Sequence, residues 1–292
     1  MKLAGERYRQ WRAEGADVEL LSASDMTALL GTNKYHGGWL DKRGGGLQPL
    51  SYARELGRAA IKAGATIYTS SPVEHLTKTE NGWQAKTTNG AVVNAKTVVL
   101  CTNAYGNGLV PGLQESIIDA NTYQVATEPL PQDIADTILP DGHVASDTKN
   151  LLFYFRKDHT GRFMMGGRGP LREPRSEADW AHLKRAAVKM FPVLSHAKWQ
   201  FHWCGRVAIT RDYFPHLHEP AQDLFVDIGC MGRGVGLQTS MGRAIANYIH
   251  TRDAKALPLP VSKIKSLPLY PLRRIYVGAV VAWYRMTDGG MD

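Results

Sequence analysis

The 292-residue sequence has few cysteines, no apolar stretch among its first residues and no long apolar run. None of its three cysteines, Cys101, Cys204 and Cys230, has Cys-x-x-Cys spacing, and an odd number argues against a disulfide scaffold. The charged first residues lack the apolar core of a signal peptide. The longest apolar run, 275–283, is too short to span a bilayer. These absences predict reduced thiols, a cytoplasmic location and no membrane association.

Basic residues are in excess, but they are not clustered. The formal net charge is +8, yet no run of five basic residues and no motif for reading DNA or RNA occurs. We therefore expect no nucleic-acid partner, and a surface suited to small anionic ligands. Hydrophobic residues make up 43% and charged residues 21%, which is typical of a globular protein with one large or two ordinary domains.

Motifs for hydrolytic and metal chemistry are also missing. There is no Gly-x-Ser-x-Gly elbow to carry a serine nucleophile. His216, His218 and Glu219 lie in what reads as a proline-flanked loop without a third metal ligand, so no metal is expected. Cys101 and Cys230 are expected to pack as small apolar groups rather than to act as nucleophiles. The pattern identifies no catalytic residue.

The most informative feature is a glycine-rich turn near the end of the chain. The apolar run 224–228 precedes Gly229-Cys-Met-Gly-Arg-Gly-Val-Gly236, and an amphipathic segment follows, which predicts strand, turn and helix. Such a turn leaves backbone N–H groups free at a helix N-terminus, where they bind a phosphate or the electron-rich edge of a flavin ring. It is not a Gly-x-Gly-x-x-Gly fingerprint, and no such fingerprint occurs early in the chain.

The remaining patterns predict a mixed α/β organisation. Helices are expected at 51–63, 176–190 and 272–285, and Tyr52, Leu56, Ala59, Ala60 and Ala63 form the apolar stripe of the first. Strands are expected at 65–69, 73–77 and 97–101, with a hairpin at Asn89-Gly90. The middle of the chain reads as antiparallel strands. We predict α/β plus α+β, with 1–108 and 205–292 forming one domain and 109–204 a sheet-rich domain inserted into it.

The order of these segments resembles a known family. Gly38-Trp-Leu-Asp-Lys-Arg-Gly-Gly-Gly, the helix, Val73, the hairpin and Val98-Val-Leu-Cys-Thr-Asn-Ala-Tyr105 resemble the D-amino-acid-oxidase-like FAD-dependent oxidoreductases. The stretch 203–215 and the glycine turn resemble the same family's C-terminal third. Within it the sequence is most similar to gamma-glutamylputrescine oxidase-like members. The resemblance implies an FAD/NAD(P)-binding-type domain and an inserted antiparallel-sheet substrate domain. It also implies oxidation of a small primary or secondary amine, gamma-glutamylputrescine-like or amino-acid-like, by hydride transfer to flavin.

The resemblance also implies where FAD lies. The backbone of Val73 would contact the adenine or ribose end, and Thr102 and Asn103 would border the same pocket. The pyrimidine edge of the flavin would lie against the glycine turn, where the helix N-terminus stabilises negative charge on the reduced ring. The Gly44–Gly46 loop would come near the flavin face. The turn residues implied as cofactor-binding are Gly232, Arg233, Gly234, Val235 and Gly236.

Two departures from the family pattern narrow the expected substrate and cofactor attachment. Amino-acid-oxidising members carry an arginine two positions after the glycine that is Gly205 here, whereas this sequence has Val207 there and Arg206 one place earlier. A one-place shift in a strand turns a side chain to the other face, which favours an amine without a nearby carboxylate. Cys204 is one place from where relatives attach flavin covalently, so non-covalent FAD is expected.

A third departure is at the front of the chain. The family's pyrophosphate loop would lie upstream of Met1, so the FAD-binding domain is expected to be incomplete, with an exposed apolar surface and weak FAD affinity. Two alternatives stay open. The chain is an amine-oxidising flavoprotein, given as a fragment, from a misplaced gene start, or as half of a split enzyme whose other chain supplies that segment. Alternatively, it is a non-catalytic remnant that does not bind FAD alone.

Overall fold

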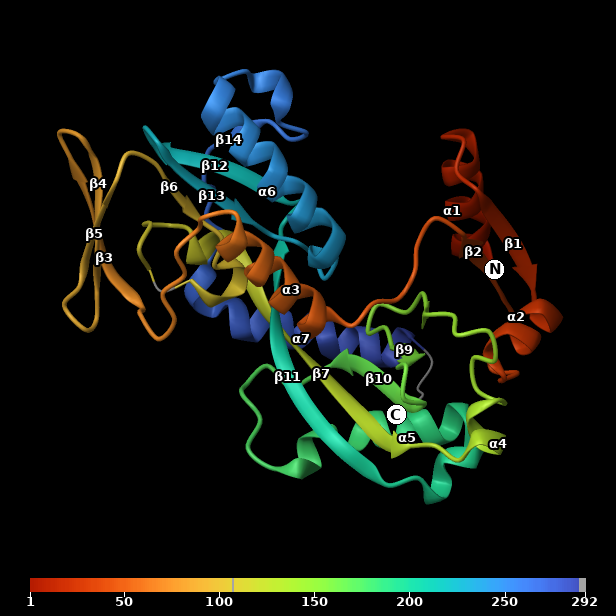
Figure 1. Ribbon diagram of the computed structural model, residues 1–292. Coiled ribbons are helices and arrows are strands. Elements are labelled where there is room, and N and C mark those ends of the chain that lie inside the picture. The colour runs from red at the N-terminus through yellow and green to blue at the C-terminus, as the bar shows by residue number, and fades with distance from the viewer. Residues whose placement is uncertain (107, 289–292) are drawn as a thin grey trace. The chain divides into compact units, whose positions relative to one another are not determined.

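The computed structural model describes residues 1–106 and 108–288, which fold as two compact units (Figure 1). The first unit comprises Met1–Gln48, Asn121–Gly205 and Ile275–Asp292. The second comprises Pro49–Ala120 and Arg206–Arg274. Each unit is therefore assembled from segments that are distant in sequence.

A five-stranded sheet and one helix form the core of the first unit. The strand order is β11 (Trp199–Thr210), β7 (Ile117–Pro129), β10 (Arg162–Arg168), β9 (Tyr154–Lys157) and β8 (Ala145–Ser146). From β7 to β8 every pairing is antiparallel. Helix α5 (Ala181–Met190) buries its apolar face against Phe163 and Met165 of β10, with Phe191 packed edge-on to Phe163 at 5.3 Å between ring centroids.

The N-terminal part of the first unit is a small helix and strand layer. Helix α1 (Lys2–Ala13) precedes β1 (Val18–Ser22), which pairs antiparallel with β2 (Gly37–Asp41). Helix α2 (Ala23–Leu30) begins with a capping box between Ser22 and Asp25, which satisfies two backbone donors at its first turn. The unit also contains α4 (Gln132–Ala135) and, from Ile275 onward, α7 (Arg273–Thr287).

The second unit contains two sheets and two long helices. The first sheet has the order β14 (Val261–Ser262), β12 (His216–Ala221), β13 (Leu224–Ile228) and β6 (Val98–Leu100). Strands β13 and β6 are parallel, whereas β12 and β13 form an antiparallel hairpin. The second sheet is a meander of β3 (Val73–Thr79), β4 (Gly82–Thr87) and β5 (Val92–Ala95). The helices are α3 (Pro49–Lys62) and α6 (Gly234–Thr251).

Helix α3 is amphipathic, but none of its residues is buried. Leu56 is 51% exposed and Ile61 57%, and Leu50 and the following Ile67 are also exposed. The helix contacts α6 through a hydrogen bond of 2.8 Å between the hydroxyls of Tyr52 and Thr239. Its apolar side therefore presents an uncovered surface within the described residues.

Two predicted elements are corrected by the structure. Residues 65–69 form no strand, although their composition is β-favouring, because no neighbouring strand pairs with them in the described chain. His216 and His218 lie in strand β12 rather than in a loop, since the antiparallel pairing with β13 overrides the nearby prolines. The described helices include none that is both long and apolar enough to cross a bilayer.

The compact units differ from the predicted domains in the two terminal segments. The division falls near 120 and 205, close to the predicted boundaries at 108 and 205. However, 1–48 and the residues from 275 group with the middle of the chain rather than with the glycine turn. Leu30 explains part of this, because it belongs to the core cluster that contains Phe163 and Leu183.

Candidate cofactor and substrate sites

The glycine turn follows a fully buried strand and reverses the chain within a few residues. All five residues of β13 are buried, which fixes the end of the strand. Gly229, Met231 and Gly232 then have φ values of +87°, +52° and +76°. At Gly229 a Cβ atom would lie 2.4 Å from Cγ2 of Thr210, so glycine is required there. Helix α6 begins two residues after the last of them, at Gly234.

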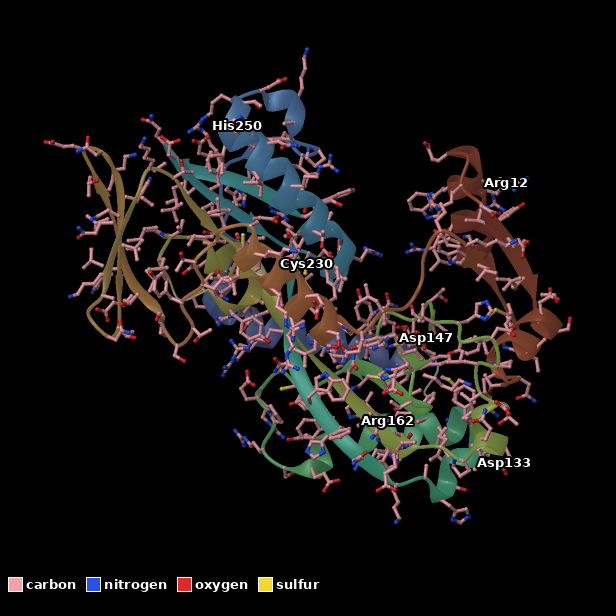
Figure 2. The ribbon with its side chains drawn as sticks, viewed as in Figure 1. Arg12, Asp133, Asp147, Arg162, Cys230 and His250 are labelled. Atoms are coloured by element: carbon pink, nitrogen blue, oxygen red, sulfur yellow. The ribbon has the colours of Figure 1, made fainter. Side chains whose placement is uncertain are left out.

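Asn103 holds this turn from the neighbouring strand. Its Oδ1 accepts a hydrogen bond from the backbone N–H of Gly229 at 3.1 Å, and its Nδ2 donates to Sγ of Cys230 at 3.4 Å (Figure 2, with Cys230 labelled). Asn103 follows β6, which pairs in parallel with β13, so the two strand ends lie side by side. The structure thus joins two of the predicted cofactor-binding segments.

The N-terminus of α6 is open. Among the described residues, no side chain caps it, and a Cβ at Gly232 or Gly236 would meet no atom within 4 Å. Arg233 and Val235 are exposed. The first N–H groups of a helix have no partners within the helix and carry the positive end of its dipole. Backbone donors with uncovered glycines beside them fit an anionic or electron-rich group such as the pyrimidine edge of a flavin.

The other predicted FAD contacts lie elsewhere in the second unit. Thr102 and Asn103 border a cavity of about 10 Å³, which is too small to hold a nucleotide. Val73 opens strand β3 in the three-stranded sheet and pairs there with Thr87. Neither observation assigns an adenine or ribose pocket to these residues.

Asp227 is a buried charged residue that sequence analysis overlooked. It lies in β13, is 5% exposed, and has an Oδ1 without a hydrogen-bond partner in the described structure. Burial raises the pKa of Asp227 to about 6, and a hydrogen bond from Gln238 of α6 partly opposes the increase. The only sequence signal was a single acidic residue inside the apolar run 224–228.

The two histidines considered as metal ligands have structural partners. His218 is buried and its Nδ1 lies 2.8 Å from the carbonyl oxygen of Ser262, while His216 lies 3.0 Å from Asp212. Burial lowers the pKa of His218. Within residues 1–106 and 108–288, no group of three potential metal ligands occurs.

Arg206 is engaged by Tyr105. The backbone N–H of Arg206 donates to the Tyr105 hydroxyl at 2.9 Å, and the guanidinium lies 5.5 Å from the centroid of the Tyr105 ring. This cation–π geometry gives the guanidinium a protein partner.

The sheet of the first unit carries a cavity of about 280 Å³. The Gly44–Gly46 loop closes against it: a Cβ at Gly46 would lie 2.7 Å from Cγ1 of Val144, and Nη1 of Arg156 donates to the carbonyl of Leu47 at 2.7 Å. The walls come from β7, β8, β9 and β10 and from the residue before β8. The lining residues are Gln124, Val144, Ala145, Ser146, Tyr154, Phe155, Arg156, Met164 and Gly166.

Comparison with known proteins identifies the family. The pattern of the family described as FAD dependent oxidoreductase (DAO) matches residues 1–248. The chain belongs to this family. FAD is the family's cofactor, so the predicted family and cofactor are confirmed.

Curated relatives are longer than this chain. It is 29% identical over 244 residues to a probable oxidoreductase OrdL of Haemophilus influenzae, covering 82% of this chain and 55% of that protein. It is 28% identical over 292 residues to the gamma-glutamylputrescine oxidoreductase of Escherichia coli, covering 97% of this chain and 67% of the relative. The chain thus spans roughly half to two thirds of the length of these relatives.

Solved structures confirm the predicted fold class. The glycine oxidase of Geobacillus kaustophilus superposes with a TM-score of 0.74 at 20% identity, covering 90% of this chain and 70% of that one. The L-proline dehydrogenase of P. horikoshii gives 0.68 at 19% identity, covering 85% and 68%. At these identities the likeness concerns the fold.

Proposed function

We propose that this chain is the flavin-edge and substrate-binding part of an FAD-dependent oxidoreductase that oxidises a small amine. The observation that carries the proposal is the open N-terminus of α6, whose turn is held by Asn103. In this proposal the second unit contacts FAD without a covalent bond, and the cavity on the sheet of the first unit receives the substrate.

When bound, FAD supplies the hydride acceptor for amine oxidation. The chain's own residues would orient the flavin and the substrate and would stabilise charge on the flavin ring. The N–H groups at the start of α6 would stabilise negative charge at the pyrimidine edge, and Asn103 would keep the turn in the conformation that presents them. The aromatic and aliphatic walls formed by Tyr154, Phe155 and Met164 would exclude water from the substrate.

The position of Arg206 supports an amine over an α-amino acid. A bidentate carboxylate clamp requires a guanidinium whose fork faces the substrate. Arg206 instead lies over the ring of Tyr105, and Val207 stands where amino-acid-oxidising members carry arginine. The E. coli relative is named for its substrate gamma-glutamylputrescine, which is an amine. We therefore propose a polyamine-like substrate.

Replacing a glycine at the start of α6 tests the cofactor site. Gly236 and Gly242 both lie on α6 with open space where a side chain would project. Leucine at either position improves helix propensity by about 1 kcal/mol, so neither variant should unfold the chain. Gly236→Leu should weaken FAD binding at least tenfold, measured by flavin fluorescence titration, whereas Gly242→Leu should bind as the wild type does.

Equal FAD affinity of the two variants would contradict the proposed site. If the wild-type chain retains FAD through gel filtration, its absorption band near the flavin maximum makes a substrate screen feasible. Dye reduction should then be faster with gamma-glutamylputrescine or putrescine than with glycine or proline. A preference for the amino acids would refute the proposed substrate class.

A second candidate function is supported by helix α3. Its exposed apolar side, with Leu56 and Ile61 more than half exposed, favours a chain that requires a further segment to bind FAD. In that case the chain alone is a non-catalytic part of a split enzyme or a remnant. A folded, monodisperse sample that binds no FAD at any concentration would favour this candidate over the first.

A further inference from the structure

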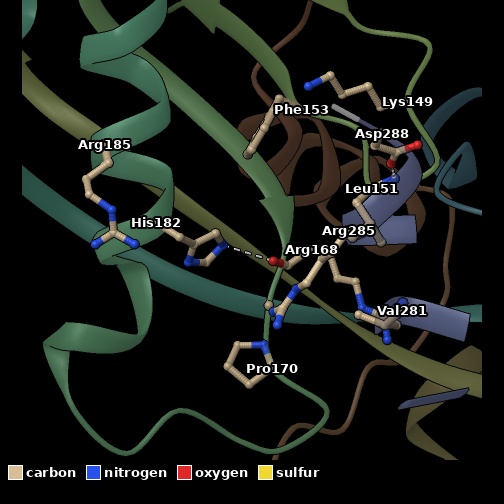
Figure 3. Close-up of a pocket in the computed structure, with 11 residues that line it drawn as sticks. Lys149, Leu151, Phe153, Arg168, Pro170, His182, Arg185, Val281, Arg285 and Asp288 are labelled. Atoms are coloured by element: carbon tan, nitrogen blue, oxygen red, sulfur yellow. Dashed lines mark hydrogen bonds between the residues drawn. The ribbon is translucent and has the colours of Figure 1, made fainter. Parts of the chain in front are cut away.

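A cationic cavity of about 350 Å³ lies in the first unit, between α5, the end of β10 and the last turns of α7 (Figure 3). None of its lining residues lines the cavity on the sheet described above. Four of its side chains are cationic and one is a carboxylate. The charged residues are Lys149, Arg168, Arg185, Arg285 and Asp288.

Arg168 is the centre of the argument because part of its guanidinium is buried without compensation. Its Nη2 has no hydrogen-bond partner anywhere in the described part of the chain. Burial and the nearby positive charge of Arg285 both lower the pKa of Arg168. A buried charged donor left unsatisfied costs more than its hydrogen bond contributes when made. An anion that accepts a hydrogen bond from Nη2 of Arg168 would satisfy this donor and also neutralise its charge.

The single carboxylate in the cavity already has donors. Asp288 accepts hydrogen bonds from the backbone N–H of Leu151 at 2.8 Å and from Nδ2 of Asn150 at 2.9 Å. No ion pair joins a described carboxylate to Arg168, Arg185 or Arg285. The guanidinium groups of Arg168 and Arg285 line one cavity, and neither is paired with a described acid. Guanidinium groups bind phosphate and carboxylate bidentately, so such a pair suits an anion.

Contacts between neighbouring elements hold the backbone around Arg168 in place. Nε2 of His182 donates to the carbonyl oxygen of Arg168 at 2.9 Å, which joins α5 to the end of β10. Val281 and Arg285 lie at i and i+4 on α7, so one face of the helix lines the cavity, and Asp288 directly follows the helix. Apolar walls from Leu151, Phe153, Pro170 and Val281 add room for more than a bare ion.

From this geometry we infer that the cavity binds a small organic anion, with its phosphate or carboxylate held between Arg168 and Arg285 and its apolar part against Phe153 and Val281. The volume falls in the range of small-molecule sites in proteins. The excess of positive charge excludes cationic ligands such as polyamines, so the occupant differs in chemistry from the substrate proposed above.

The test uses phenyl phosphate, benzoate and phenol as probes in calorimetric titrations of the full chain at constant ionic strength. Phenyl phosphate, benzoate or both should bind with a stoichiometry of one, and phenol should bind at least tenfold more weakly. Binding of all three with equal affinity, or of none at millimolar concentration, would overturn the inference.

Three glutamine variants locate the site. Arg168→Gln and Arg285→Gln should each weaken anion binding about tenfold to a hundredfold, because a hydrogen bond between charged groups is lost. Arg274→Gln, at an exposed position on the same helix, is the matched control and should bind like the wild type. Arg285 is exposed, so its replacement does not threaten the fold.

Thermal unfolding without anion adds a readout that a purely structural role would not give. Arg168→Gln should keep or raise the unfolding midpoint, since it removes a buried charge that has an unsatisfied donor. The same variant should lose the stabilisation that the anion gives to the wild type. A lowered midpoint with unchanged anion binding would show that Arg168 is structural and would refute the inference.

Discussion

The buried carboxyl of Asp227 leads to a prediction about stability and pH. The residue lies in β13, an inner strand of the second unit's four-stranded sheet, and is 5% exposed. One of its carboxylate oxygens lacks a hydrogen-bond partner in the described structure. Burial disfavours its ionised form and raises its pKa from 3.8 to about 6. A group whose pKa is raised by folding binds its proton more tightly in the folded state. The free energy of unfolding therefore falls as pH rises between the two pKa values.

The magnitude follows from the difference between the two pKa values. Each pKa unit corresponds to about 1.4 kcal/mol. Ionisation of Asp227 therefore removes about 3 kcal/mol from the free energy of unfolding once the pH has risen past both pKa values. About half of this loss falls between roughly pH 5 and 8, where the protein can be handled. Asp227→Asn keeps the shape, retains an oxygen for Gln238 and has no charge to desolvate. It should abolish this part of the pH dependence.

Urea denaturation at several pH values between about 5 and 8 measures the effect, with Trp83 as the fluorescent residue of the second unit. The wild type should lose between 1 and 2 kcal/mol, as an order of magnitude, relative to Asp227→Asn across this range. Glu80→Gln, at an exposed position, should retain the wild-type slope. Parallel curves for the wild type and Asp227→Asn would refute the reasoning, because they would mean that Asp227 ionises as easily in the folded as in the unfolded chain.

Two further predictions compare matched substitutions. Gly229→Ala should destabilise more than Gly90→Ala: both glycines have φ near +86°, which costs an L-residue about 1–2 kcal/mol, but only at Gly229 would the new Cβ meet an atom, at 2.4 Å. Equal losses in urea titrations would mean that the chain relaxes around position 229. Leu217→Ala, at a fully buried position, should cost about 2–5 kcal/mol, whereas Leu56→Ala should cost less than about 1 kcal/mol. A large loss at Leu56 would show that α3 is covered in solution, and sedimentation velocity would identify whether a second copy covers it.

Local patterns predicted the strand, turn and helix around the glycine turn well, because the relevant signals are short in sequence. The glycines of 229–236 and the apolar run before them specified strand, turn and helix, and the structure has β13, the turn and α6 at those positions. Asn103 was expected beside the adenine or ribose end of FAD, not at this turn, and only through the family resemblance. Its hydrogen bond to Gly229 spans 126 residues, a separation that no local pattern encodes.

The errors arose where pairing between distant segments decides the structure. Residues 65–69 have the composition of a strand but no partner among the described residues, while His216–Ala221 becomes a strand because β13 and β14 both pair with it. β-propensity reports that a segment fits a pleated surface, not that such a surface is present. The same reason explains why Asp227 was missed, since its perturbed pKa arises from neighbours contributed by other segments.

Helix α3 illustrates the limit of periodicity most clearly. Its apolar residues predicted an amphipathic helix, and the helix is present, but the face that the pattern marks for burial is exposed. A period of 3.6 residues records that one face avoids water; it carries no information about which surface covers that face. Among the described residues, none buries Leu56 or Ile61. The hydroxyls of Tyr52 and Thr239 join α3 to α6 by a hydrogen bond. A partner that covers the exposed face of α3 should therefore also raise the affinity of the α6 turn for flavin.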